Sequence, residues 1–185
     1  MKYYSDNSKQ YIDSTINCDM AEQYNLFLKY FSGKSILDVG FGSARDMLHF
    51  QSLGYIVSGV DPTPEFCDNA KRYGFSVVCS PIEEYTSQVK FDAIWACASL
   101  LHCTNLKVAF KRCYDLLNDG GILYASLKYG DFVGEKNGRF FHYMNEEILN
   151  SILKELDFTL IEKTITFDVR TDRADEKWIN IVLQK

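Results

Sequence analysis

The stretch Ile36-Leu37-Asp38-Val39-Gly40-Phe41-Gly42 decides how this chain of 185 residues folds. Its short apolar run is typical of a buried strand, and a helical pattern over 45–53 follows at once. Glycine lets the backbone turn sharply and approach a ligand without a clash at Cβ. The N-terminus of the next helix then presents free N–H groups to that ligand. The stretch therefore predicts a strand, turn and helix that bind a nucleotide-like molecule.

A carboxylate follows the next predicted strand. Asp61 lies 21 residues after Gly40, at the tip of the strand expected over 55–60. A carboxylate at this place can accept hydrogen bonds from both hydroxyls of a ribose. Dinucleotide-dependent oxidoreductases share this pattern, so other residues must decide the cofactor.

Three details argue against a dinucleotide. The segment Gly40-Phe-Gly-Ser-Ala-Arg45 lacks the third glycine of the dinucleotide pattern, which helps to hold a pyrophosphate. Arg45, on the first turn of the helix, could pair with a carboxylate such as that of a methionine moiety. Asp38, at the strand end, would repel a diphosphate but suits an α-ammonium group.

Short apolar runs alternate with helical patterns along most of the chain, which is typical of βαβ units and a parallel sheet. The last two strands, expected over 158–169 and 177–184, have a connector too short for a parallel crossover. We therefore predict an α/β, Rossmann-like, doubly wound sheet of seven mostly parallel strands. One antiparallel strand lies near the C-terminus, and helices lie on both faces. We expect one domain over 1–185, with 1–18 a flap or tail and 130–143 a substrate-side loop.

Composition disfavours several classes of function. The net charge is −5 and basic residues occur at most in pairs, so we expect no DNA partner. No apolar run approaches the ~18 residues that span a membrane, and no signal peptide opens the chain, so we expect no membrane partner and a cytoplasmic location. The six cysteines form no CxxC pair, so we expect reduced thiols and no metal.

The residues from Ile36 to Asp46 resemble motif I of the class I S-adenosylmethionine-dependent methyltransferases. They are most similar to the small branch that includes the tellurite-resistance methyltransferases. Similar blocks lie at 59–65, 91–102, 117–124, 126–130 and 138–141, so the resemblance covers nearly the whole chain. Phe41 and Ala44 depart from the pattern, where a small residue and a third glycine are usual. The resemblance implies this fold, S-adenosylmethionine as cofactor and S-adenosylhomocysteine as product.

The resemblance also implies roles for single residues. Gly40 and Gly42 would contact the methionine part, and Asp61 would hold the ribose. Tyr11 would close over the cofactor, and Tyr3 and Tyr4 could do the same. The remaining residues expected near the cofactor are Pro62, Thr63, Ile82 and Glu83 around the adenine, and Ala96 and Cys97 beneath the sulfonium. With Asp38 and Arg45, these complete the expected cofactor site.

The acceptor side is less defined by the sequence. His102 follows the fourth strand and could orient or deprotonate an acceptor. Lys128, Arg139 and Arg170 could bind an anionic substrate, although exposed charges are usually solvated. The chain has no large target-recognition segment, so we expect a methyltransferase that acts on a small molecule. The alternatives are a non-catalytic binding module or partner-dependent subunit, a protein or RNA methyltransferase, and a dinucleotide-dependent oxidoreductase; the sequence leaves the oligomeric state open.

Overall fold

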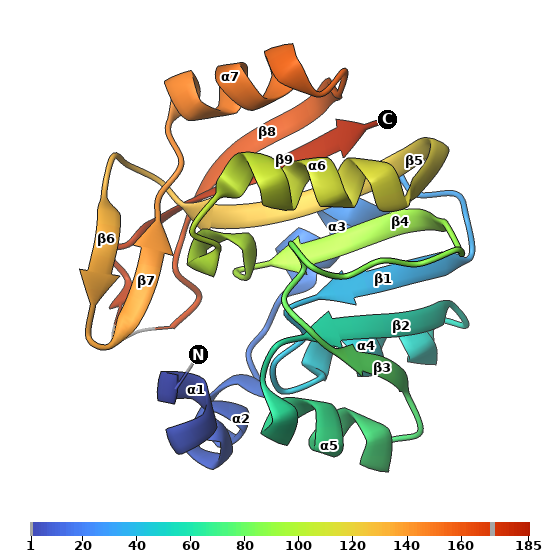
Figure 1. The fold of residues 1–185 in the computed structure, drawn as a ribbon, viewed down its shortest axis with the longest axis vertical. Coiled ribbons are helices and arrows are strands. Elements are labelled where there is room, and N and C mark those ends of the chain that lie inside the picture. Colours follow the sequence, from blue (N-terminus) through green and yellow to red (C-terminus); the bar gives the residue numbers. More distant parts are fainter. Residues whose placement is uncertain (1, 171–172) are drawn as a thin grey trace.

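A seven-stranded sheet forms the centre of the protein in the computed structural model, which describes residues 2–170 and 173–185 (Figure 1). The strands are β1 (Ser35–Val39), β2 (Ile56–Asp61), β3 (Ser76–Cys79), β4 (Phe91–Cys97), β5 (Leu117–Lys128), β8 (Thr159–Phe167) and β9 (Lys177–Gln184), in the order β3-β2-β1-β4-β5-β9-β8. β9 is antiparallel to both neighbours, and the other pairs are parallel. The predicted sheet is confirmed.

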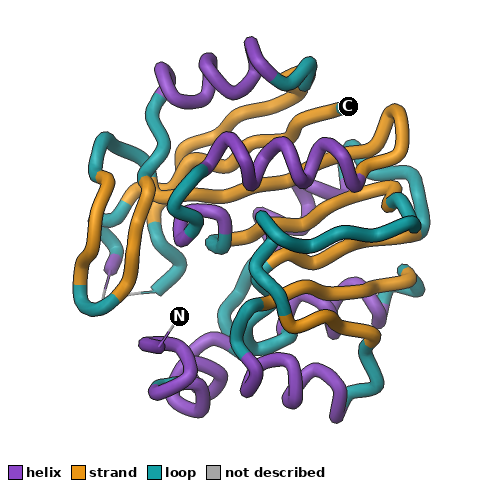
Figure 2. The backbone as a smooth tube through the Cα atoms, in the orientation of Figure 1, coloured by secondary structure: helices purple, strands orange, loops and turns teal. Residues whose placement is uncertain are grey.

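Helices cover both faces of the sheet (Figure 2). The side chains of α3 (Ala21–Leu28), α4 (Arg45–Ser52) and α5 (Pro64–Arg72) belong to one apolar cluster. Those of α6 (Leu106–Leu116) and α7 (Glu146–Glu155) belong to a second cluster on the opposite face. No helix in the described part of the chain is long and apolar enough to cross a membrane.

Strand β4 shows why the sheet is covered by helices on both faces. Ala93 and Trp95 enter the first cluster, whereas Ile94 and Ala96 enter the second. Successive side chains of a strand point to opposite faces, so a strand covered on both sides must be apolar at nearly every position. The near-continuous apolar run of β4 therefore requires helices on both faces.

The carboxyl ends of the parallel strands point toward two small units of structure (Figure 1). One comprises the N-terminal helices α1 (Lys2–Asp6) and α2 (Ser8–Thr15), and the other is a hairpin of β6 (Val133–Lys136) and β7 (Arg139–His142). At the hairpin's tip, Asn137 and Gly138 have φ values of 53° and 72°, the left-handed conformations that a two-residue hairpin turn requires. The segment predicted as a loop over 130–143 thus contains paired strands, which its Asn-Gly pair could have indicated.

Candidate functional site

The glycine turn after β1 is too crowded for any other residue. Gly40 and Gly42 have φ values of 72° and 51°. A Cβ added to Gly40 would lie 2.4 Å from the Cβ of Ser99, and one added to Gly42 would lie 2.9 Å from Cε1 of Tyr11. Ala44, where the resembling family usually has a third glycine, also adopts a left-handed φ of 65°. The turn therefore keeps the expected backbone shape without that glycine.

A cavity of about 580 Å³ opens beside this turn, at the carboxyl ends of β1, β2 and β4. It is large enough for a ligand of the size that protein pockets commonly bind. Eight of the residues expected around the cofactor line it: Tyr11, Gly40, Gly42, Asp61, Pro62, Thr63, Ile82 and Glu83. The structure thus brings together most of the cofactor residues expected from sequence.

Asp61 joins the end of β2 to the glycine turn. One carboxylate oxygen accepts a hydrogen bond from the N–H of Gly42 at 3.1 Å, and the other accepts from the N–H of Thr63 at 2.8 Å. Burial raises the pKa of Asp61 to about 6, and these backbone N–H groups partly oppose the rise. Each oxygen can accept a further bond, so the carboxylate suits the two hydroxyls of a ribose.

Asp38, two residues before Gly40, carries a buried carboxylate oxygen with no hydrogen-bond partner among the described residues. Burial raises its pKa well above the ordinary value, and the nearby Asp46 adds to the rise. A buried, unpartnered polar oxygen is costly unless a ligand satisfies it. An ammonium group would do so, and the glycine turn leaves the backbone bare beside it. These residues fit S-adenosylmethionine, whose methionine part carries such a group.

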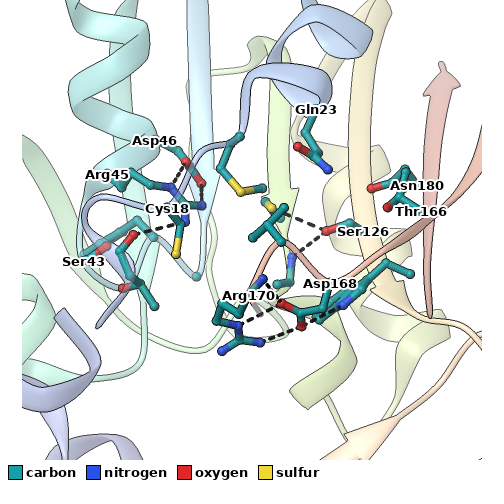
Figure 3. A pocket seen from close by; sticks show the side chains of 18 of the residues that line it. Cys18, Gln23, Ser43, Arg45, Asp46, Ser126, Thr166, Asp168, Arg170 and Asn180 are labelled. Carbon is teal, nitrogen blue, oxygen red and sulfur yellow. Dashed lines mark hydrogen bonds and ion pairs between the residues drawn. The ribbon is translucent and has the colours of Figure 1, made fainter. Parts of the chain in front are cut away.

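A second, smaller cavity of about 100 Å³ adjoins the first, and both are lined by Tyr11, Gly40 and Ala98. Figure 3 shows two ion pairs facing it: Arg45 with Asp46 at 2.7 Å, and Arg170 with Asp168 at 2.8 Å.

Arg45 is fixed by its neighbour. Asp46 accepts hydrogen bonds from the Tyr24 hydroxyl at 2.5 Å and the Trp95 indole N–H at 2.9 Å, besides those from Arg45. The guanidinium also donates to the Thr15 carbonyl at 3.4 Å. Arg45 therefore lines the smaller cavity as half of a buried ion pair with Asp46, whereas sequence suggested that it pairs with a ligand carboxylate.

The expected floor of the site shifts by two residues. Ala96 is fully buried in the apolar cluster of α6 and contacts neither cavity. Because side chains alternate along β4, Cys97 lines the smaller cavity instead. Ala98, just beyond the strand, lines both cavities and is therefore better placed than Ala96 for the role expected beneath the sulfonium.

His102, in the short 3-10 helix η1 (Leu100–His102), lines the larger cavity. Its Nδ1 lies 2.8 Å from the carbonyl oxygen of Phe140, and its Nε2 lies 2.7 Å from the hydroxyl of Tyr4. Because a carbonyl can only accept, we assign the proton to Nδ1, and the Tyr4 hydroxyl donates to Nε2. Burial, together with the charges of Arg139 and Lys128, lowers the pKa of His102 to about 4, although the hydrogen bond to Phe140 opposes this shift. The imidazole is therefore neutral near pH 7 and acts as a hydrogen-bond acceptor.

The three cations expected on the acceptor side have different surroundings. Lys128 is only 6% exposed, forms an ion pair with Glu176 at 2.5 Å and lines neither cavity. Its charge is therefore already paired and covered, and its substrate role stays a prediction. Arg170 faces the smaller cavity, and Arg139 faces the larger one.

Sequence reasoning missed several lining residues. Phe66, Ser99 and Phe140 line the larger cavity. Ser99 could have been inferred from its place just after β4, where parallel strands present ligand-binding residues. Phe140 had no such signal, because it arrives from the hairpin. No cluster of His, Cys, Asp or Glu in the described residues could hold a metal ion.

Comparisons with known proteins agree with this geometry. The family described as "Methyltransferase domain" matches residues 37–125. The ubiquinone biosynthesis O-methyltransferase of Bradyrhizobium sp. (strain ORS 278) is 30% identical over 115 residues, which cover 59% of this chain and 46% of that protein. The chain thus matches about half the length of this curated relative.

Solved structures extend the similarity of fold to almost the whole chain. The 1,6-didemethyltoxoflavin-N1-methyltransferase of Burkholderia thailandensis, solved with 1,6-didemethyltoxoflavin and S-adenosylhomocysteine, has a TM-score of 0.76 at 22% identity, covering 99% of this chain and 87% of that one. The N-methyltransferase NodS of Bradyrhizobium japonicum WM9, solved with S-adenosylhomocysteine, has a TM-score of 0.71 at 16% identity, covering 97% and 98%. The sequence match thus lies within the segment that holds the first five strands, and the fold of the described residues is that of solved S-adenosylmethionine-dependent methyltransferases.

Proposed function

We propose that this protein transfers a methyl group from S-adenosylmethionine to a small-molecule acceptor. The observation that carries the proposal is the larger cavity, which is lined by the glycine turn and by Asp61; Asp38, with its unpartnered oxygen, is buried in β1 and lines neither cavity. The carboxylate suits a ribose, the bare backbone suits close approach, and the buried oxygen suits an ammonium group. Together they match the three polar parts of one cofactor.

When bound, S-adenosylmethionine supplies an electrophilic methyl group. The chain's own task is to hold the acceptor close and in line, and to exclude water. Ala98 and Gly40 lie where the two cavities meet, so small residues line the place where donor and acceptor would approach. Tyr11 lies over the same junction and would shield it.

The named relatives support an acceptor of small size. One is called a ubiquinone biosynthesis O-methyltransferase and another was solved with 1,6-didemethyltoxoflavin. The segments that could cover an acceptor are short: the two N-terminal helices, the β6–β7 hairpin and the connection after β8, whose Arg170 lines the smaller cavity. We place the chain in the small branch that includes the tellurite-resistance methyltransferases as part of the same proposal, on the motif blocks quoted above.

Calorimetric titration with S-adenosylhomocysteine, with NADH in parallel, tests the cofactor. We expect micromolar binding of S-adenosylhomocysteine and none of NADH. Binding of NADH alone would favour an oxidoreductase. Binding of neither would favour a non-catalytic module or a partner-dependent site.

The pH dependence of that titration tests Asp61. Its raised pKa, about 6, means that the free protein holds this proton below pH 6 and releases it above. The hydroxyls of a ribose donate to the ionised form, so affinity for S-adenosylhomocysteine should be full above about pH 7 and fall as the pH drops through 6. Asp61→Asn should bind about tenfold or more weakly, the scale of a lost charge-assisted hydrogen bond, and should lose this pH dependence. An unchanged affinity in the variant would contradict the ribose assignment.

A further inference from the structure

The cations beside the two cavities differ in whether a carboxylate neutralises them. Lys128 is paired with Glu176, and Arg170 is paired with Asp168. Arg45 is paired with Asp46. Arg139 has no carboxylate partner among the described residues, although it lines the larger cavity. Its charge is therefore available to a ligand.

Aromatic rings hold the Arg139 guanidinium in place without neutralising it. Its central carbon lies 4.6 Å from the centre of the Tyr3 ring and 5.0 Å from that of Phe141. Such contacts stabilise a cation modestly and leave its N–H groups able to donate. Its Nε is buried and has no hydrogen-bond partner in the described structure. An unused buried donor on a charged group is costly, and an anionic oxygen would satisfy it.

A phenol already lies between this arginine and His102. The hydroxyl of Tyr4 donates to Nε2 of His102 at 2.7 Å, and the central carbon of Arg139 lies 6.0 Å from the centre of the Tyr4 ring. Tyr4 therefore satisfies the lone pair of His102 Nε2, which leaves Arg139 as the charged donor that lines this part of the cavity.

Charge is also divided along the larger cavity. Asp61, Glu83 and Glu84 line the end near β2 and β3, where the cofactor's adenosine is proposed to lie. Arg139 lines the end near β7. An anionic group would be repelled from the first end and attracted to the second. These charges would therefore direct the acidic group of an acceptor toward Arg139 and away from the cofactor's adenosine.

We propose that the methyl acceptor is a small acidic molecule whose anionic oxygen accepts a hydrogen bond from the Arg139 guanidinium in the larger cavity. The proposal rests on the proposed function, because it assigns the acceptor of that same site. It narrows the acceptor to molecules that carry a carboxylate or a phenolate.

Matched probes test the proposal on the full chain saturated with S-adenosylhomocysteine. The carboxylate arm titrates 3,4-dihydroxybenzoate against its neutral amide, 3,4-dihydroxybenzamide. The phenolate arm titrates 4-nitrophenolate against neutral 4-nitroanisole in mildly alkaline buffer. We expect the anion to bind about tenfold or more tightly than its neutral partner in at least one arm, and the arm that shows it identifies the acidic group.

Two variants distinguish a specific role of Arg139 from the general effect of removing one positive charge from the hairpin. Arg139→Gln should abolish the preference for the anion and leave the affinity for S-adenosylhomocysteine within about twofold. Lys136→Gln removes an exposed cation at the paired position of the same hairpin and should change neither. Equal binding of anionic and neutral probes in both arms, an unchanged preference in Arg139→Gln, or no binding of either anion overturns the proposal. The titration with S-adenosylhomocysteine is done first, before any probe is added. If S-adenosylhomocysteine does not bind, the proposed function fails, and this outcome is thereby distinguished from failure of the acceptor proposal.

Discussion

At the scale of single residues, the glycine turn depends on two separate constraints. Gly40 and Gly54 both have a positive φ, 72° and 88°, which any residue with a Cβ adopts only with strain. A Cβ at Gly40 would also collide with Ser99, whereas a Cβ at Gly54 would meet nothing within 4 Å. The difference between the two positions therefore isolates the steric constraint from the backbone constraint.

The substitutions Gly40→Ala and Gly54→Ala measure that difference. Gly54→Ala should lower the free energy of unfolding by about 1–2 kcal/mol through backbone strain alone. Gly40→Ala should lower it by roughly 1–3 kcal/mol more, the usual cost of overpacking, and should also weaken binding of S-adenosylhomocysteine. Urea unfolding and calorimetry provide the two readouts. Equal destabilisation by the two variants would mean that Ser99 moves aside freely.

At the scale of elements, the N-terminal helices lie over the site through a chain of aromatic rings. The ring of Tyr11, in α2, stacks edge-on with Tyr4 of α1 at 5.3 Å and lies 5.3 Å from Phe66 of α5. It also packs directly against Gly42. The segment expected to be a flap or tail is thus helical in this structure. Its Tyr11 ring contacts the glycine turn at the carboxyl end of β1.

Removing the Tyr11 ring should let the bound cofactor dissociate faster. We expect Tyr11→Ala to weaken S-adenosylhomocysteine binding about tenfold, mostly through faster dissociation, because changes at an existing interface act mainly on that rate. Stopped-flow displacement measures the rate directly. Tyr73→Ala, which truncates an exposed tyrosine at the end of α5, is the matched control and should change nothing. An unaltered dissociation rate in Tyr11→Ala would show that α2 does not cover the cofactor.

At the scale of the whole molecule, one sheet joins two apolar clusters. Because β4 contributes alternate side chains to each, neither cluster can lose its packing without disturbing the strand that both share. Trp95 lies in the cluster of α3, α4 and α5, and Trp178 packs against the other. The two indoles therefore report separately on the two faces.

Single-tryptophan variants test whether the faces unfold together. In both Trp95→Phe and Trp178→Phe, the urea midpoint from fluorescence should coincide with that from far-ultraviolet circular dichroism, as two-state unfolding requires. Trp95→Phe should also lower stability by about 1–3 kcal/mol, because the buried Asp46 loses one donor. Midpoints that differ within one variant would show that the faces unfold independently.

The sequence by itself determined the sheet, the glycine turn and the ends of the strands that line the larger cavity. These features follow from local rules: apolar periodicity, glycine at left-handed positions, and the fact that parallel strands end at one edge. Asp61 could be placed beside Gly42 because both follow adjacent strands. The β6–β7 hairpin was also within reach, since Asn137 and Gly138 form a strong turn signal.

Only the tertiary structure decided which side chains face the ligand and which charges remain unpaired. The face of the sheet toward which Ala96 points depends on the register of β4. A shift of one residue moves every side chain of the strand to the opposite face. Lys128 is neutralised by Glu176, and His102 is oriented by Phe140; each partner comes from a segment far along the chain. Arg139 has aromatic rings, and no carboxylate, as its neighbours among the described residues. The strength of an ion pair depends on distance and burial in three dimensions, and no local pattern in the sequence records either quantity.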